Sequence, residues 1–486
     1  MRAHAVVVFC LTAVAASAVG IPAQGVRGVA TSAARYIQIR PIQRDTIPLS
    51  AVQRDANDAT TYEGAPITCV PGFQYCVRYV AGEVENAVAF SQDVSFTAWG
   101  LGLQGLSATV LLRARVDGGS FVWPRSDDSF DAMLAYAELD RVRYRVRLGR
   151  QRATSGLGFS GYDGASVLYE PASPIRVEGF AGRSLARGLD EPRNDALRSI
   201  EDFVLDRDAW LFGASIRAEP LSGVSLTARY QREIWSDRSG LLSERASLDF
   251  RAPLPGRISI SAAADYDFAF GRVGKSNVTL SAPFAADRVR VEAVARRYVP
   301  YFELWTIWGF FDPVAWHEIE LRGNWRVGST IALRGYVGLR KYGDTNAPII
   351  LSELPDRAQR GGIGANWRIS DDLIIDADYA IEKGFGAFLS TGSAMARWQA
   401  LSRISLTANL TAFQQIEEFR VGEGAVVGGG LFASFEATER TGLDVGANLY
   451  RQTFDGRANS PDWNQFRGFA SLRIGFGRDP GRPRQP

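Results

Sequence analysis

The stretch ELDRVRYRVRLGRQRATSGLGFSGYDGASVLYE, residues Glu138 to Glu170, decides the fold. Its first half alternates arginine, at positions 141, 143, 145 and 147, with an apolar residue at each position between. A period of two is the period of a β-strand, because successive side chains point to opposite faces of the pleated backbone. Four arginines are too many for a dry face and unusual for a solvated one. The strand is therefore predicted to have one charged face and one apolar face.

The same strict alternation returns along the rest of the chain, in segments of about ten or more residues. Soluble sheets turn the apolar face inward, whereas outer-membrane barrels turn it to lipid and line a wet lumen with polar residues. The repeated charged face favours an all-β, transmembrane, antiparallel up-and-down β-barrel over a soluble sandwich or propeller. The clearest segments are 258–268, 318–326, 331–340, 372–382, 403–411 and 443–449.

The connections between these segments alternate in length. Short turns rich in Pro, Gly, Asp and Ser lie at 139–141, 170–174, 219–223, 252–256, 326–329, 369–372, 398–402 and 437–441. Longer segments lie between them, at 117–129, 151–162, 186–208, 300–313, 343–357 and 454–463. Short periplasmic turns and long extracellular loops are typical of outer-membrane barrels. Counting this alternation predicts about 22 strands, of which the first is a segment near Tyr75 to Ala81; about 20 is the alternative, with 88–102 outside the barrel.

The N-terminus is typical of a secretory signal peptide. Arg2 precedes a short apolar run, and small residues lead to a cleavage site after Ala23, with Ala18 as the alternative. We therefore expect a signal peptide over 1–23, a periplasmic extension over 24–74, the barrel over 75–477 and a tail over 478–486. The predicted location is the outer membrane of a Gram-negative bacterium.

Cys69 and Cys76, in TCVPGFQYC, are the two cysteines left after processing. Pro71 and Gly72 favour a turn that brings them together. In an exported protein such a pair favours a disulfide. A metal site is the alternative, but histidine and further cysteine ligands are missing nearby.

Composition excludes several classes of function. The chain has 55 Lys+Arg and 53 Asp+Glu, so the basic excess that nucleic-acid binding needs is missing. His317 is the histidine that remains after processing, so the histidines that a catalytic triad or a zinc site usually requires are almost absent. We expect no enzyme activity, no cofactor and no metal. The expected partners are outer-membrane lipid, a small polar or anionic solute and the barrel assembly machinery, since the strand Asn464 to Phe476 resembles the aromatic-ended assembly signal of outer-membrane proteins.

Alternation also predicts which side chains line the lumen. An arginine group is expected on early strands, and farther round the barrel a group of carboxylates, Glu318, Glu320, Asp376 and Asp378, is expected to supply the opposite charge. Such groups would set a field across a wet pore, or the charges would pair with each other and stiffen the wall. The predicted pore-lining residues are Arg113, Arg115, Arg143, Arg145, Arg147, Glu318, Glu320, Arg322, Arg334, Asp376 and Asp378.

The longest extracellular loop is expected between residues 186 and 208. It is strongly charged, and we expect it to fold inward and narrow the pore, because a barrel this wide needs an obstruction to be selective. The charged residues of this predicted constriction are Asp190, Glu191, Arg193, Asp195 and Arg198.

The segment LGRQRATSGLGFSGYDGASVLYEP resembles a strand–loop–strand of alginate-export-type barrels, which carry a G-R-Q step, a glycine-rich loop and a D-G-A step. The matching residues are Gly149, Arg150, Gln151, Asp163, Gly164 and Ala165. The resemblance covers 24 of the 486 residues. It implies a channel-forming outer-membrane barrel of a family that handles polyanionic or small polar solutes. The GxGxxG match from Gly156 to Gly161 is no nucleotide motif, because a strand rather than a helix is expected to follow it.

Two classes of function remain. The first is an outer-membrane, porin-like channel that passes small polar or anionic solutes. The second is a barrel that transports nothing and acts in structure or surface interaction. A TonB-dependent transporter is disfavoured, because the region before the predicted barrel is too short for a folded plug. Ion conductance in planar bilayers discriminates the two classes.

Overall fold

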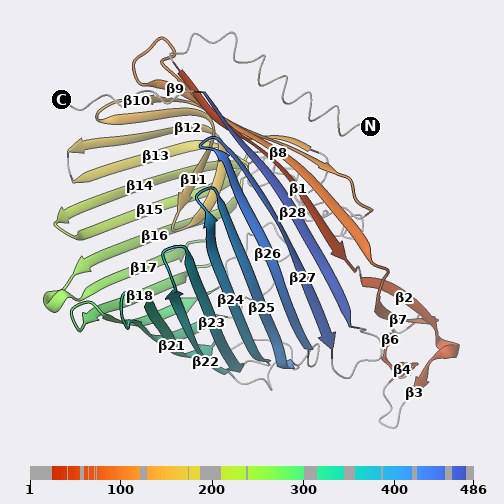
Figure 1. Ribbon diagram of the computed structural model, residues 1–486. Helices are drawn as coiled ribbons and strands as arrows, with labels where there is room; N and C mark the ends of the chain where they lie inside the picture. Colours follow the sequence, from red (N-terminus) through yellow and green to blue (C-terminus); the bar gives the residue numbers. More distant parts are fainter. Residues whose placement is uncertain are drawn as a thin grey trace.

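The described chain is built almost entirely of β-strands, and 22 of them form one closed antiparallel barrel (Figure 1). The computed structural model describes residues 25–40, 42–54, 60–63, 65–69, 72, 74–120, 129–172, 174–185, 209–236, 239–299, 315–343, 356–384, 387–418, 424–454 and 462–477. The barrel closes because β1 pairs with the last strand, β28, on one side and with β8 on the other. The predicted fold class and the count of 22 strands are confirmed.

The barrel strands follow one another around the wall in sequence order from β8 onward. They are β1 (Gly25–Ile39), β8 (Glu85–Trp99), β9 (Leu106–Asp117), β10 (Ser129–Asp140), β11 (Tyr144–Ser155), β12 (Gly158–Ala172), β13 (Ile175–Ser184), β14 (Ala209–Leu221), β15 (Val224–Trp235), β16 (Leu241–Pro253), β17 (Ser259–Asp267), β18 (Arg272–Phe284), β19 (Val289–Tyr298), β20 (Trp316–Arg326), β21 (Ile331–Tyr342), β22 (Arg357–Arg368), β23 (Leu373–Gly384), β24 (Ala387–Leu401), β25 (Ile404–Glu418), β26 (Gly424–Thr438), β27 (Thr441–Phe454) and β28 (Trp463–Gly477).

Apolar and charged side chains lie on opposite faces of the wall, in the reverse of the arrangement found in a soluble protein. Ile319 and Leu431 are each 71% exposed, whereas Glu318 and Glu320, beside Ile319 on β20, are each 2% exposed. Apolar residues on the outer surface and charged residues on the inner one suit a barrel surrounded by hydrocarbon. This closed barrel with an even number of antiparallel strands has the architecture of bacterial outer-membrane proteins, and the chain is one of them. We call the inner surface, which alternates with the exposed apolar residues, the lumen face.

The connections at one end of the barrel are tight. Leu221 pairs with Val224 and Leu401 with Ile404, so these hairpins have two-residue turns. The first of these turns contains Gly223, whose φ of 79° favours glycine. No helix in the described part of the chain is long and apolar enough to cross a membrane; the short 3-10 turns are η1 (Leu49–Ala51) and η3 (Pro255–Arg257).

The predicted first strand is wrong. The first barrel strand is β1, residues Gly25–Ile39, which lies inside the segment expected to be a periplasmic extension over 24–74. The segment Tyr75–Ala81 forms β7, which pairs outside the barrel with β2. Sequence alternation missed β1 because one face mixes two arginines with valine and isoleucine and the other is mostly Ala, Ser and Gly, so apolar and polar sides barely differ. The predicted barrel range 75–477 is therefore corrected to begin with β1.

The segment between β1 and β8 forms two small sheets beyond the barrel end (Figure 1). One contains β2 (Ile42–Pro48), β7 (Tyr75–Ala81) and β6 (Thr68–Cys69), and the other contains β3 (Gln53–Arg54), β4 (Thr60–Tyr62) and β5 (Ala65–Pro66). The predicted disulfide between Cys69 and Cys76 is present and joins β6 to β7. It holds this projecting element together at the barrel end opposite the tight turns.

Candidate functional site: the lumen and its inward hairpin

The β11–β12 hairpin leaves the barrel wall halfway along its length. β11 pairs with β10 only up to Arg150, and β12 pairs with β13 only from Tyr162 onward. Between these points the two strands pair with each other alone, up to the last pair, Ser155 with Gly158. The sequence predicted a loop over 151–162; the described residues instead continue the hairpin beyond the wall.

The tip of this hairpin reaches strands β15 and β16, which are separated from β12 by β13 and β14. The Arg245 guanidinium, on β16, donates from Nη1 to the carbonyl oxygen of Leu157 at 2.9 Å. The Gln231 amide, on β15, donates to the Ser160 hydroxyl at 3.0 Å. Because Arg245 and Gln231 belong to the lumen face, the tip, residues 155–160, crosses part of the barrel interior.

Two glycines allow the hairpin to bend away from the wall. Gly149 and Gly164 lie opposite each other in the β11–β12 register. Gly149 has a φ of 123°, and a Cβ atom there would overlap the carbonyl oxygen of Ala135 on β10. A Cβ atom on Gly164 would overlap the carbonyl oxygen of Ala181 on β13. Each strand therefore passes so close to its wall neighbour that only glycine fits.

An ion pair fastens the hairpin at this bend. The Arg150 guanidinium donates from Nε and Nη2 to the two carboxylate oxygens of Asp163, each at 2.8 Å. Its remaining nitrogen, Nη1, donates to the carbonyl oxygen of Ala132 on β10 at 3.0 Å. Two parallel bonds fix the orientation of the guanidinium, and the third ties the bend to the wall strand beside it.

A buried glutamine covers the lumen side of the same bend. Gln151 is 2% exposed. Its amide nitrogen donates to the carbonyl oxygens of Gly164 and Arg147, at 3.0 and 3.2 Å, and its amide oxygen accepts from the Ser166 hydroxyl at 2.7 Å. These bonds satisfy backbone groups near the point where wall pairing stops. The residues of the G-R-Q and D-G-A steps thus build the departure of the hairpin.

A second charged group lies on the lumen face of β19 to β22. The Glu318 carboxylate has 0% side-chain exposure and contacts three arginines: Arg340 at 2.7 Å, Arg296 at 3.1 Å and Arg360 at 3.2 Å. Glu320, two residues further along β20 on the same face, contacts Arg296 at 3.3 Å and also pairs with Arg322. We call these residues the Glu318 cluster. It joins four consecutive strands through their side chains.

Arg334 forms a neighbouring cluster with two aspartates. It lies on β21 and crosses β22 to contact Asp376 at 2.6 Å, and it also pairs with Asp378. Gly364, on β22, makes room for this crossing, because a Cβ atom there would lie 2.6 Å from Arg334 Nε. The predicted residues Arg334, Asp376 and Asp378 are therefore brought together rather than set apart.

The arginines predicted on the early strands also have carboxylate partners close by. Arg113 pairs with Asp93 at 2.8 Å, and Arg147 with Glu138 at 2.5 Å. Arg115 pairs with Asp131 at 2.9 Å, and Arg145 with Asp140 at 3.3 Å. Arg143 lies before β11 begins, in the turn, and is exposed. Of the two alternatives offered by the sequence, the contacts show local pairing in both groups, and the role of these residues in lining a pore stays a prediction.

Several residues at these positions were not singled out from the sequence. Arg296, Arg360 and Glu382 complete the contacts around Glu318 and Arg340, and Arg245 holds the hairpin tip. Alternation places each on the lumen face, but it gives no register between strands. The predicted constriction residues, Asp190, Glu191, Arg193, Asp195 and Arg198, lie outside the described residues. Within the described ranges no three His, Cys, Asp or Glu side chains gather in a way that would hold a metal ion.

No protein-family model matches the chain, and neither does any curated protein. Among solved structures, a BenF-like porin from Pseudomonas fluorescens Pf-5 is 9% identical, with 93% of this chain and 100% of that chain covered and a TM-score of 0.40. Pseudomonas aeruginosa OccK2 (OpdF), in complex with glucuronate, is 8% identical over 93% and 98%, with a TM-score of 0.40. The ferric enterobactin receptor PfeA of Pseudomonas aeruginosa is 12% identical over 92% and 81%, with a TM-score of 0.45. Similarity at this level supports no argument about function.

Proposed function

We propose that this barrel is an outer-membrane channel for small polar solutes, and that the β11–β12 hairpin narrows it. The observation that carries the proposal is the docking of the hairpin tip on Arg245 and Gln231 across the barrel interior. A barrel of about 22 strands is too wide to select small solutes by its wall alone. A short, glycine-rich hairpin fastened at both its bend and its tip is a compact way to narrow such a lumen.

The orientation follows from the connections. Tight turns belong at the periplasmic end and long loops at the extracellular end. The hairpin tip and the small sheets between β1 and β8 lie at the ends of strands remote from the tight turns. We therefore place both on the extracellular half, so a solute entering from outside meets the hairpin first.

A porin-like preference for anions would not come from an excess of wall arginines, because those named above lie beside carboxylates. Ion pairs of this kind stiffen the wall and leave little net field. Selectivity for solute charge would then depend on cations near the hairpin that are not held by a carboxylate. The resemblance of the G-R-Q and D-G-A steps to alginate-export-type barrels stays a proposal, and no substrate is carried over with it.

Conductance in planar bilayers tests the channel. The full chain is expected to conduct, and replacing residues 152–161 by Asn-Gly is expected to raise the conductance at least about twofold, because the obstruction is removed. A control variant replaces the exposed turn residues 102–104 by Asn-Gly and should conduct like the unaltered protein. A barrel that inserts but carries no current, or equal conductance in the shortened and unaltered proteins, would refute the proposal.

The projecting sheets favour a second candidate, a surface-interaction barrel that transports nothing. A disulfide-bonded element outside the membrane is suited to contact other molecules. The same bilayer experiment separates the two, since this candidate requires no current through the inserted protein.

A further inference from the structure

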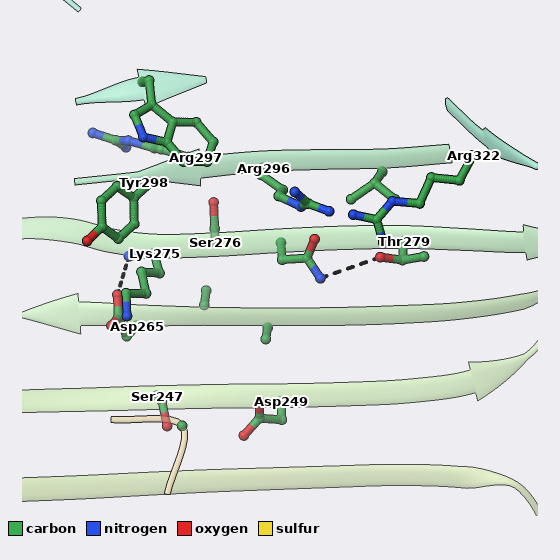
Figure 2. A pocket seen from close by; sticks show the side chains of 16 residues that line it. Ser247, Asp249, Asp265, Lys275, Ser276, Thr279, Arg296, Arg297, Tyr298 and Arg322 are labelled. Atoms are coloured by element: carbon green, nitrogen blue, oxygen red, sulfur yellow. Dashed lines mark hydrogen bonds between the residues drawn. The ribbon is translucent and has the colours of Figure 1, made fainter. Parts of the chain in front are cut away.

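The lumen face carries a cavity next to the hairpin tip that neither the bend nor the wall clusters explain. Its volume is about 370 Å³, and it extends over β16 to β20 (Figure 2). Gly156, at the hairpin tip, lines it together with wall residues. A volume at the lower end of the range for ligand sites suits a molecule of monosaccharide size. The hairpin thus brings any solute that passes it close to this cavity.

Three buried polar atoms of the residues that line the cavity lack a partner among the described residues, and two of them belong to side chains of the lumen face. These two are the Ser247 hydroxyl oxygen, on β16, and the amide oxygen of Asn277, on β18. The third is Nε of Arg297, on β19. Ser247 is 7% exposed. The Asn277 amide nitrogen donates to the Thr279 hydroxyl at 3.4 Å, which orients the side chain and leaves its oxygen available. Buried polar atoms are almost always hydrogen-bonded, so two such atoms in one cavity indicate a ligand with hydroxyl groups.

The cavity also contains a cation that the carboxylates leave available. Arg296 and Arg322 line it but are held by Glu318 and Glu320. Lys275, on β18, has no carboxylate at salt-bridge distance from its ammonium group among the described residues. Its nearest described aromatic contact is the Tyr298 ring, whose centroid lies 5.6 Å from Nζ.

The two aspartates in the cavity are already engaged. Asp265 accepts from Arg245 at 2.6 Å and from the backbone N–H of Lys275, and Asp249 pairs with Arg229. Their partners neutralise them. Arg297 also lines the cavity and contacts no carboxylate among the described residues, but it follows the lumen-face residue Arg296 on β19 and therefore belongs to the opposite face of that strand. The ammonium group of Lys275 is then the lumen-face charge that can bind a solute. A compact ammonium with three donors suits a carboxylate.

An aromatic end completes the cavity. Tyr298 and Trp316 lie side by side, with ring centroids 5.4 Å apart and an angle of 37° between the rings. Both line the cavity, and Figure 2 shows Tyr298 above Lys275. Aromatic rings offer an apolar surface to the C–H groups of a solute whose other groups are polar.

We propose that this cavity binds a small hydroxylated carboxylate. Lys275 binds the carboxylate, Ser247 and Asn277 bind hydroxyl groups, and Tyr298 with Trp316 contacts the carbon chain. The inference deepens the proposed function and rests on it, since it makes the cavity a solute-binding station beside the hairpin.

Calorimetric titration of the full-length barrel in detergent tests the binding, with three six-carbon probes: sodium gluconate, hexanoate and sorbitol. Gluconate has both carboxylate and hydroxyl groups, hexanoate lacks the hydroxyls and sorbitol lacks the charge. Gluconate should bind in a saturable manner. Loss of a charge-assisted hydrogen bond in Lys275→Gln should raise its Kd at least about tenfold. The double variant Ser247→Ala/Asn277→Ala should weaken gluconate and leave hexanoate unchanged.

Lys341→Gln is the matched control, because Lys341 lies on β21 outside the cavity and is largely exposed. It should bind gluconate like the unaltered protein, and heat-modifiable gel mobility should show that every variant is folded. Absence of saturable gluconate binding, equal Kd values for unaltered protein and Lys275→Gln, or equal binding of hexanoate and gluconate would overturn the inference. Conductance without gluconate binding would support the channel and refute the solute-binding role of the cavity. Gluconate binding without conductance would support the cavity as a binding site and refute the channel.

Discussion

The β11–β12 hairpin and the wall strands β19 to β22 use the same chemistry, arginine paired with carboxylate, for different purposes. In the wall, Glu318 is fully buried and three arginines from three other strands surround it. At the hairpin bend, one arginine meets Asp163, whose side chain is 41% exposed. The wall cluster crosses strand boundaries, whereas the bend pair joins two neighbouring strands at the point where they leave the wall.

The difference shows what each charge can contribute. Loss of a buried carboxylate among three guanidinium groups removes the partner that all three share and leaves the remaining charges of the cluster unbalanced in a poorly solvated place. A half-exposed ion pair is screened by water and contributes little to stability. We therefore expect the Glu318 cluster to determine whether the barrel stays folded, and the hairpin pair to determine where an already folded element lies.

The largest effect should come from Glu318→Gln. Removing one charge from the buried cluster leaves Arg296, Arg340 and Arg360 without their shared partner, which should lower the free energy of unfolding by roughly 3–5 kcal/mol. Urea unfolding followed by heat-modifiable gel mobility measures this. Glu439→Gln, in the tight turn between β26 and β27, serves as the control and should change the midpoint little. Equal midpoints for the two variants would mean that the cluster is not a structural unit.

A smaller effect is expected from Gly164→Ala. A methyl group there overlaps the Ala181 carbonyl oxygen, so the bend must shift, at a cost of roughly 1–3 kcal/mol in unfolding free energy. Because the hairpin then leaves its position, the conductance should rise as well. Gly179→Ala is the matched control on β13, where the nearest atom to a new Cβ is 3.9 Å away. If both variants matched the unaltered protein, the bend would not depend on glycine.

The smallest effect on stability should come from Asp163→Asn. The Arg150–Asp163 pair is partly exposed, so its loss should lower the unfolding free energy by about 1 kcal/mol or less. The current is the more sensitive measurement: a hairpin released at its bend should increase the open-channel noise. Asp371→Asn, in an exposed turn, should leave the noise unchanged. Quiet recordings from Asp163→Asn would show that the tip contacts alone hold the hairpin.

Arg245→Met tests the other fastening of the hairpin and sharpens the contrast with the wall. The variant removes both the bond to the Leu157 carbonyl oxygen and the ion pair with the buried Asp265 carboxylate, so it should also lower the free energy of unfolding. We expect a noise increase like that of Asp163→Asn and a still larger one when the two changes are combined. Single-channel recordings of both single variants and the double variant measure the coupling between bend and tip. Equal open-channel noise in the two single variants and the double variant would mean that the bend contact and the tip contact do not hold the hairpin independently.

Much of the architecture could be predicted from the sequence because it depends on local periodicity. Alternation at period two specifies which side chains share a face, and a long charged face specifies the inverted barrel. The length of the connections then specifies the strand count, and the spacing of Cys69 and Cys76 specifies the disulfide. Each of these properties is set within about fifteen residues, which is the range over which a sequence pattern can be read.

Three features were decided only by the tertiary structure. β1 has little contrast between its faces, and its place in the barrel depends on pairing with β28, more than four hundred residues away. The apolar–polar alternation ends after Leu148, so the sequence predicted a loop over 151–162 rather than a paired hairpin. Close contact with β10 and β13 makes Gly149 and Gly164 necessary. The burial of Glu318 depends on the register of strands that alternation orients but does not align. The physical reason is common to all three: a strand period fixes the face of a side chain, whereas its neighbours are fixed by the closure of the whole sheet.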